Sequence, residues 1–181
     1  MQPHELPKLI EGLSVLDNES LNGDPMSFKG KIVVPFGADK ILKVASTFDT
    51  AGDLQILREA ERRGIDFYLQ SEVLYQGVMT ILAQPKIKVV PLPTVDLQGM
   101  KWKTLNVWCG ETYTTEEEVI YRLALDQYGE EMVNKIKAFN EEFLIGNIYW
   151  RNIGVDPETG KIKCYDFQFG RARNEKGELR V

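Results

Sequence analysis

The stretch NIYWRNIGVDPETGKIKCYDFQFG, from Asn147 to Gly170, decides the expected fold of this 181-residue chain. Two β-like runs, NIGV and KIKCYDF, flank DPETGK, whose Asp-Pro start and late glycine are strong turn chemistry. The stretch therefore predicts a β-hairpin. Asn147 and Asn152 precede this hairpin, and Asp166 stands at its end. Carboxylate and amide oxygens, such as those of Asp166 and Asn152, are chemically suitable ligands for Mg²⁺.

The composition limits the classes of protein to which the chain can belong. Hydrophobic residues make up 43% and charged residues 27%, which is ordinary for a folded protein of one domain or two small lobes. A formal net charge of -5 argues against nonspecific nucleic-acid binding. No apolar run approaches the ~20 residues of a membrane span, and MQPHELPKLIEG lacks the apolar region of a signal peptide. We expect neither a nucleic-acid nor a membrane partner.

The few cysteines and the single histidine exclude several kinds of site. Cys109 and Cys164 show no metal-binding spacing, which predicts a reducing compartment such as the cytoplasm. His4 is the one histidine, and we expect it to lie in a frayed terminus. A Ser-His-Asp triad, a His-rich metal site and an HExxH motif are thereby excluded.

The N-terminal half predicts a small antiparallel sheet. Up to about Leu21 the chain is polar, and we expect it to be irregular, with GLSVL as a candidate short strand. The β-branched runs at 31–37 and 40–46, joined by a Gly-Ala-Asp turn, predict a β-hairpin. The apolar stretch 73–83 is ambiguous between a strand and a buried helix.

Three amphipathic stretches predict helices. The first, 49–64, has Asp49 or Thr50 as its N-cap and a glycine at its end. The second, 114–129, begins with threonines and carries acidic residues in its first turn, which suits the helix dipole. The third, 130–143, spaces its apolar residues for one face.

Two further runs predict strands near the middle of the chain. Residues 86–93 alternate and end in prolines, which indicates a strand meeting a loop; residues 100–110 alternate and stop at a glycine, which indicates a strand and a linker. The order of elements predicts an α+β fold, with a strand-rich N-terminal lobe at 1–110 and a helical C-terminal lobe at 111–181.

The C-terminal residues resemble the protein-kinase-like fold, including its aminoglycoside-kinase and small-kinase relatives. The family pattern H-x-D-x-x-x-x-N places a base five residues before a metal-binding Asn. In this chain Asn147 stands at the Asp position and Asn152 at the final Asn, while Asp166-Phe167 falls where the D-F-G motif begins. The resemblance implies that Asn152 and Asp166 bind Mg²⁺ and that Asn147 orients the acceptor.

The N-terminal half carries weaker points of the same resemblance. ILKV resembles the strand with the ATP-binding lysine, which implies this role for Lys43, and LREAERR resembles the αC helix, with Glu59 as the partner of Lys43 in the cleft between lobes. Gly23 and Gly30 are the glycines available for a phosphate-binding loop, and Cys109 lies where the hinge is expected. ATP is the implied cofactor.

Three departures from the family pattern define the expected type of kinase. Asn147 replaces the catalytic Asp, the glycine-rich loop is thin, and only eleven residues follow Gly170, with no A-P-E segment. The resemblance thus implies a bilobal minimal kinase-like fold. It has an antiparallel N-lobe sheet with one αC-like helix and a reduced helical C-lobe, as in bacterial effectors and phage proteins. The resemblance also implies that the protein acts in the cytoplasm or is delivered into the cytosol of a host cell.

Two functions of different classes remain open from the sequence. The first is an ATP-dependent phosphotransferase that modifies a protein substrate. The alternative is a pseudokinase that serves as a nucleotide-binding or protein-interaction module, because an Asn cannot accept a proton at neutral pH. Glu141 or Glu142 could replace that base only if the loop folded back. A small-molecule kinase is disfavoured by the missing C-terminal helices.

Each candidate residue also has a purely structural interpretation. Taken singly, Asp166 is a strand-end acid and Asn152 a turn residue, while Lys43 and Glu59 are a surface lysine and a helix-face charge. The combination of spacing and hairpin favours the nucleotide site. A lysine between Leu and Val in a strand also points to the face opposite its apolar neighbours.

Overall fold

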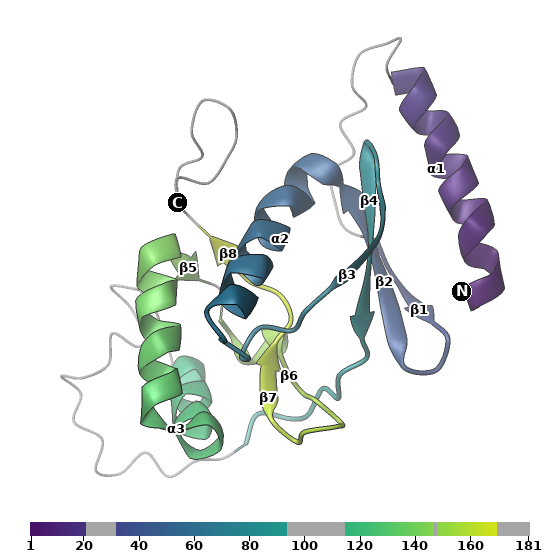
Figure 1. The fold of residues 1–181 in the computed structure, drawn as a ribbon. Coiled ribbons are helices and arrows are strands. Elements are labelled where there is room, and N and C mark those ends of the chain that lie inside the picture. The colour runs from purple at the N-terminus through teal and green to yellow at the C-terminus, as the bar shows by residue number, and fades with distance from the viewer. Residues whose placement is uncertain (21–31, 94–114, 147, 170–181) are drawn as a thin grey trace. The chain divides into compact units, whose positions relative to one another are not determined.

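The structure is a computed structural model that describes residues 1–20, 32–93, 115–146 and 148–169. Helices and antiparallel strands are mixed in it, so the α+β class is confirmed (Figure 1). Along the chain the elements are η1 (Pro3–Glu5), α1 (Leu6–Ser20), β1 (Ile32–Phe36), β2 (Lys40–Ser46), α2 (Thr47–Arg62), β3 (Glu72–Gln76), β4 (Met79–Pro85), α3 (Thr115–Phe143), β5 (Ile145–Gly146), η3 (Trp150–Asn152), β6 (Ile153–Val155), β7 (Ile162–Cys164) and β8 (Gln168–Phe169).

The chain folds into two compact units. The first unit comprises Met1–Gln55 and Gln70–Lys86, and the second comprises Ile56–Leu69 and Ile87–Val181. Helix α2 therefore contributes its first turns to the first unit and its last turns to the second. The lobe boundary predicted at Gly110 lies outside the described residues.

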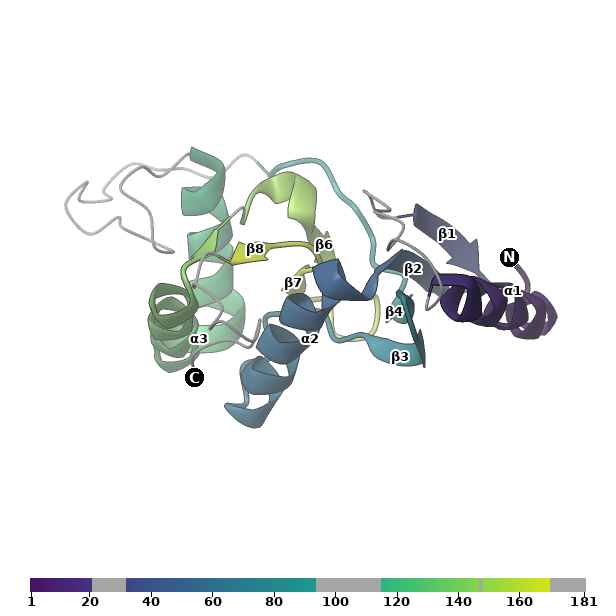
Figure 2. The ribbon, with the colours of Figure 1, turned by 90° about the horizontal axis from the view of Figure 1, so that it is seen from above.

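A four-stranded antiparallel sheet with α1 against it forms the first unit (Figures 1 and 2). The strand order is β1-β2-β4-β3, and β2 pairs with β4 from Lys40↔Pro85 to Ser46↔Met79. Because side chains alternate across a strand, one face of the sheet collects the apolar residues that pack with α1. The buried members of this core are Leu13, Leu42, Val44, Met79, Ile81 and Ala83.

The first 20 residues are helical, so the expectations of an irregular start and of a GLSVL strand are wrong. Apolar residues recur along η1 and α1 at the spacing of one helix face and pack against the sheet. A helix of this length is marginal alone and is stabilised by burying such a face. The start of the chain is also held in place, since Gly37 N donates to Met1 O at 3.2 Å. The apolar residues of this stripe are Leu6, Leu9, Ile10 and Leu13.

The two hairpins of the first unit follow the turn signals of the sequence. The hairpin predicted at 31–37 and 40–46 is confirmed as β1 and β2. The ambiguous stretch 73–83 belongs to a second hairpin, β3 and β4, interrupted at Gly77 and Val78. Strand β4 is buried over nearly its whole length between β2 and β3, which accounts for the consecutive apolar residues Ile81, Leu82 and Ala83 in it.

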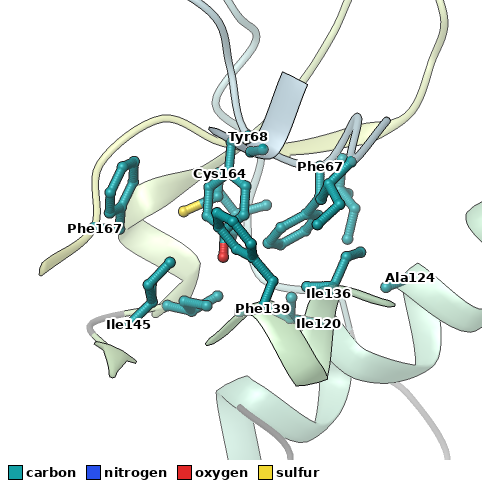
Figure 3. Close-up of a cluster of buried hydrophobic side chains, with 14 of the residues drawn as sticks. Phe67, Tyr68, Ile120, Ala124, Ile136, Phe139, Ile145, Cys164 and Phe167 are labelled. Atoms are coloured by element: carbon teal, nitrogen blue, oxygen red, sulfur yellow. The ribbon is translucent and has the colours of Figure 1, made fainter. Parts of the chain in front are cut away.

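The second unit is built around an aromatic core (Figure 3). The last turns of α2, the segment 65–69, both halves of α3 and the short C-terminal strands all contribute to it. Ring pairs within the core meet edge-on or tilted, as aromatic side chains prefer. Its largest fully buried side chains are Ile56, Ile65, Phe67, Tyr68, Ile120, Ile136, Phe139, Phe143, Ile145 and Ile148.

Helix α3 is two helices joined at Gly129, as the sequence predicted. Gly129 has φ 79° and ψ 164°, which is not helical. The two halves run in clearly different directions as a result (Figure 2). The helix predicted at 49–64 is confirmed as α2 but begins at Thr47, and the Thr50 hydroxyl bonds back to the Ser46 carbonyl instead of capping the helix.

The strand expected at 86–93 is reduced to one β-bridge, so that prediction is wrong. Lys88 exchanges both backbone hydrogen bonds with Val155, at 2.9 and 2.8 Å. Pro91 and Pro93 follow closely, and prolines cannot donate to a ladder. The strand expected at 100–110 lies outside the described residues. Within the described ranges, no helix has both the length and the apolar character of a membrane span.

Candidate functional site

Residues 145–169 form two short antiparallel strand pairs, one nested inside the other. The inner pair is the predicted hairpin, β6 with β7, in the register Ile153↔Cys164 to Val155↔Ile162. The outer pair joins β5 to β8. Nesting places the connection between β5 and β6 opposite the connection between β7 and β8. These two connections carry Asn152 and Asp166 of the sequence motif.

Asn152 and Asp166 lie at the same end of the β6–β7 hairpin. Tyr165 N donates to Asn152 O at 2.9 Å, and the Tyr165 hydroxyl donates to Arg151 O. Asn152 N is in turn bonded to Tyr149 O at 2.8 Å, which closes the turn of η3. Both Asn152 and Asp166 are half-buried. Carboxylate and amide oxygens are the kinds of ligand that a hard cation prefers.

Trp150 anchors the turn that carries Asn152. The indole is buried, its Nε1 donates to Val90 O at 2.8 Å, and its backbone N donates to a Glu116 carboxylate oxygen at 3.1 Å. Trp150 thus packs in the core of the second unit. Arg151, in contrast, is exposed, and its guanidinium lies 5.1 Å from the centre of the Tyr149 ring.

The segment that carries Asp166 is held on its other side by residues 67–69. Cys164 N donates to Phe67 O at 2.9 Å, and Leu69 N donates to Cys164 O at 2.8 Å. The Cys164 thiol donates to Asp166 O at 3.2 Å. The backbone of this segment is thus bonded both to the η3 turn and to the chain that follows α2.

Sequence reasoning missed two residues beneath this segment, Tyr68 and Asn140. The Phe167 ring lies 5.2 Å from the Tyr68 ring, and the Tyr68 hydroxyl donates to Asn140 Oδ1 (Figure 3 shows the two rings). A signal for Asn140 existed, because Ile136, Asn140 and Phe143 share the spacing of one apolar helix face. No motif singles out Tyr68.

Glu59 is engaged in an ion-pair cluster of the second unit. Its carboxylate accepts from Arg62 at 2.5 Å and from Arg63 at 2.6 Å. These hydrogen bonds, from Arg62 first, lower the pKa of Glu59 to about 2. Arg63 also pairs with Glu142 at 2.6 Å, and this tethers the end of α2 to the end of α3. The structural interpretation of Glu59, a helix-face charge pair, is borne out by these contacts.

Lys43 lies in β2 of the first unit, and only 9% of it is exposed. Its neighbours Leu42 and Val44 belong to the core with α1, so Lys43 points to the opposite face, as the alternation predicted. The pairing of Lys43 with Glu59 stays a prediction. Four other predicted site residues lie outside the described residues: Gly23, Gly30, Cys109 and Asn147.

Over the described part of the chain, no three His, Cys, Asp or Glu side chains gather into a metal-binding group. The metal site expected from the sequence would have only two protein ligands, the Asp166 carboxylate and the Asn152 amide. No family model matches the chain, and no curated protein or solved structure is significantly similar to it. Inference about function therefore rests on the residues of the site and on the resemblance of the sequence.

Proposed function

We propose that this chain is an ATP-dependent phosphotransferase of the minimal protein-kinase-like type, with a protein as acceptor. One observation carries the proposal. Tyr165 N donates to Asn152 O, and this bond brings the Asn152 turn and the Asp166 segment to one end of a hairpin. The asparagine and the aspartate of the sequence motif are then neighbours although fourteen positions separate them along the chain.

The roles of the residues follow from what phosphoryl transfer requires, which is positioning and charge neutralisation. Asn152 and Asp166 hold Mg²⁺ through hard oxygen atoms, and Mg²⁺ supplies neutralisation of the phosphate charge. Lys43 binds the phosphates of ATP, the role that the resemblance of ILKV to the strand with the ATP-binding lysine implies. Asn147 orients the acceptor hydroxyl through its amide.

The decisive experiment is calorimetric titration of ATP with and without Mg²⁺ on the wild type and on Asp166→Ala. We expect the variant to lose the Mg²⁺-dependent part of ATP binding and to keep its melting temperature. Asp156→Ala is a matched control in the same hairpin. Asp156 accepts hydrogen bonds from Glu158 N and from the Thr159 hydroxyl within the turn, so its loss lowers stability and leaves Mg²⁺-dependent binding intact.

The opposite pattern would assign Asp166 a structural role. A sharp fall in the melting temperature of Asp166→Ala, with the Mg²⁺ dependence unchanged, is that pattern. Transfer itself is measured with radiolabelled ATP, a generic protein acceptor, and Mg²⁺ or Mn²⁺. Label that enters the acceptor or the chain itself supports a phosphotransferase.

A pseudokinase is the second candidate, and Asn147 favours it. An amide at the position of the base cannot take a proton at neutral pH. In that case ATP binds in an Asp166-dependent manner but no label is transferred. The chain then serves as a nucleotide-binding or protein-interaction module.

A further inference from the structure

A tyrosine and an asparagine form a buried polar pair inside the apolar core of the second unit. Tyr68 is 1% exposed and Asn140 is not exposed at all. The Tyr68 hydroxyl donates to Asn140 Oδ1. Among the described residues, no acceptor lies within hydrogen-bonding distance of Asn140 Nδ2. A buried amide with an unmet donor is unfavourable, and a phenylalanine with a leucine would fill similar space without that cost.

The Tyr68 ring connects this pair to the Asp166 segment. Its centre lies 5.2 Å from the Phe167 ring at an interplanar angle of 66°. Phe139, one residue before Asn140 on α3, also contacts the Tyr68 ring, with the centres 5.8 Å apart. Figure 3 shows Tyr68 and Phe139 near the middle of the core and Phe167 on one side of it. Phe167 is joined to Asp166 by a peptide bond, so the place of its ring restricts the Asp166 backbone.

We propose that the Tyr68–Asn140 hydrogen bond is a positioning pair for Asp166. Asn140 lies in the second half of α3, on the buried helix face that also carries Ile136 and Phe143. The bond fixes the Tyr68 ring to this helix. The ring then holds Phe167, and Phe167 holds Asp166 next to Asn152. An effect of this pair on Mg²⁺ binding presupposes the proposed function. Its effect on the backbone around Asp166 does not.

A directional bond is needed because apolar contacts alone do not fix a ring. Dispersion and hydrophobic terms change little when a ring slides by a few tenths of an ångström. A hydrogen bond weakens steeply when its angle is lost. A buried polar pair can thereby specify one arrangement in a core that would tolerate several.

The test compares Tyr68→Phe and the double variant Tyr68→Phe/Asn140→Leu with the wild type. The double variant removes both partners of the bond, which leaves no unmet polar group and keeps stability close to that of the wild type. Tyr128→Phe is the matched control. Its hydroxyl donates to Ile162 O at 2.5 Å in the same unit, but its ring contacts Phe67 rather than Phe167.

Two measurements are made on each variant. Amide hydrogen exchange at 165–167 reports the positioning, and we expect faster exchange there in Tyr68→Phe and in the double variant but not in Tyr128→Phe. The Mg²⁺ concentration at which Mg²⁺-dependent ATP binding is half-maximal reports the effect of the pair on metal binding at Asp166. We expect it to rise by roughly 10-fold or more, the usual effect of losing a residue that orients a metal ligand.

The outcomes separate this inference from the proposed function. Unchanged exchange at 165–167 in the stable double variant overturns the positioning pair. Faster exchange with an unchanged Mg²⁺ midpoint overturns its role for Asp166. If the wild type shows no Mg²⁺-dependent ATP binding, the proposed function fails, and the exchange measurement still decides whether the pair positions the segment.

Discussion

At the scale of single residues, Glu59 shows how an ion pair sets a pH dependence. Hydrogen bonds from Arg62 and Arg63 lower the pKa of Glu59 to about 2 from its ordinary 4.5. The unfolded chain therefore takes up a proton at higher pH than the folded chain. The stabilisation is fully present above about pH 4.5 and is lost as the pH falls toward 2.

Glu59→Gln is expected to lower the free energy of unfolding at pH 7 and to lose that effect in acid. The difference between wild type and variant should shrink below about pH 4.5 and vanish near pH 2. Urea denaturation at several pH values measures it. Glu72→Gln, which removes an exposed pair with Lys40, should change stability little. A difference for Glu59→Gln that stays constant with pH contradicts the expectation.

Gly154 is required by the close approach of another residue. A Cβ at this position would lie 2.2 Å from Ile87 Cδ1 and 2.6 Å from Ile87 Cγ1. Gly154→Ala should therefore lower the free energy of unfolding by about 1–3 kcal/mol, the usual cost of overpacking. The cost should fall in an Ile87→Ala background, which a double-mutant cycle of urea denaturation measures. Equal costs in both backgrounds would exclude Ile87 as the cause.

At the scale of elements, Gly129 divides α3 into two helices. The residue has φ 79° and ψ 164°, a region open almost only to glycine. Among the residues that the structure describes, no atom lies within 4 Å of an added Cβ at this position. The constraint is therefore one of backbone conformation and not of space.

Gly129→Ala should destabilise the chain by about 1–3 kcal/mol through backbone strain. Gly12→Ala is the contrasting variant, because Gly12 lies inside α1 with open space around its added Cβ. That change should stabilise the chain by about 0.5–1 kcal/mol, since alanine favours helix interiors. Thermal and urea unfolding of both variants measure the effects. A neutral Gly129→Ala would mean that the kink is not needed for stability.

At the scale of the whole molecule, the proposed phosphoryl transfer depends on Asn147, which lies outside the described residues. If Asn147 occupies the position of the base, transfer is slow by roughly 10²–10⁴-fold, since general-base help is absent. Asn147→Asp should then raise the rate of label transfer from radiolabelled ATP. Robust transfer with Asn147 in place that is lost in Glu141→Gln would instead place the base at Glu141. No transfer after Asn147→Asp, with ATP still bound, would identify a pseudokinase.

Local pattern predicted much of the fold and part of the site. The β1–β2 hairpin, α2, the break in α3 and the β6–β7 hairpin all follow from periodicity and turn residues near in sequence. The N-terminal helix was missed, because its short apolar stripe gains stability only from the sheet it covers. A full strand was predicted at 86–93, but only Lys88 pairs with another segment, at Val155. An alternating pattern does not show how many backbone hydrogen bonds a neighbouring strand can provide.

The sequence by itself determined which residue types stand in the candidate site, since Asn152 and Asp166 are candidate oxygen ligands by residue type and by their resemblance to the family motif. Only the tertiary structure decided what stands around them. The nested strand pairs bring Tyr165 N to within hydrogen-bonding distance of Asn152 O. An ion pair joins Arg63 to Glu142, which lie 79 positions apart in the sequence. Such long-range partners depend on how the elements pack against one another. Local sequence propensity contains no information about that packing. The pairing of Tyr68 with Asn140, 72 positions apart, has the same cause.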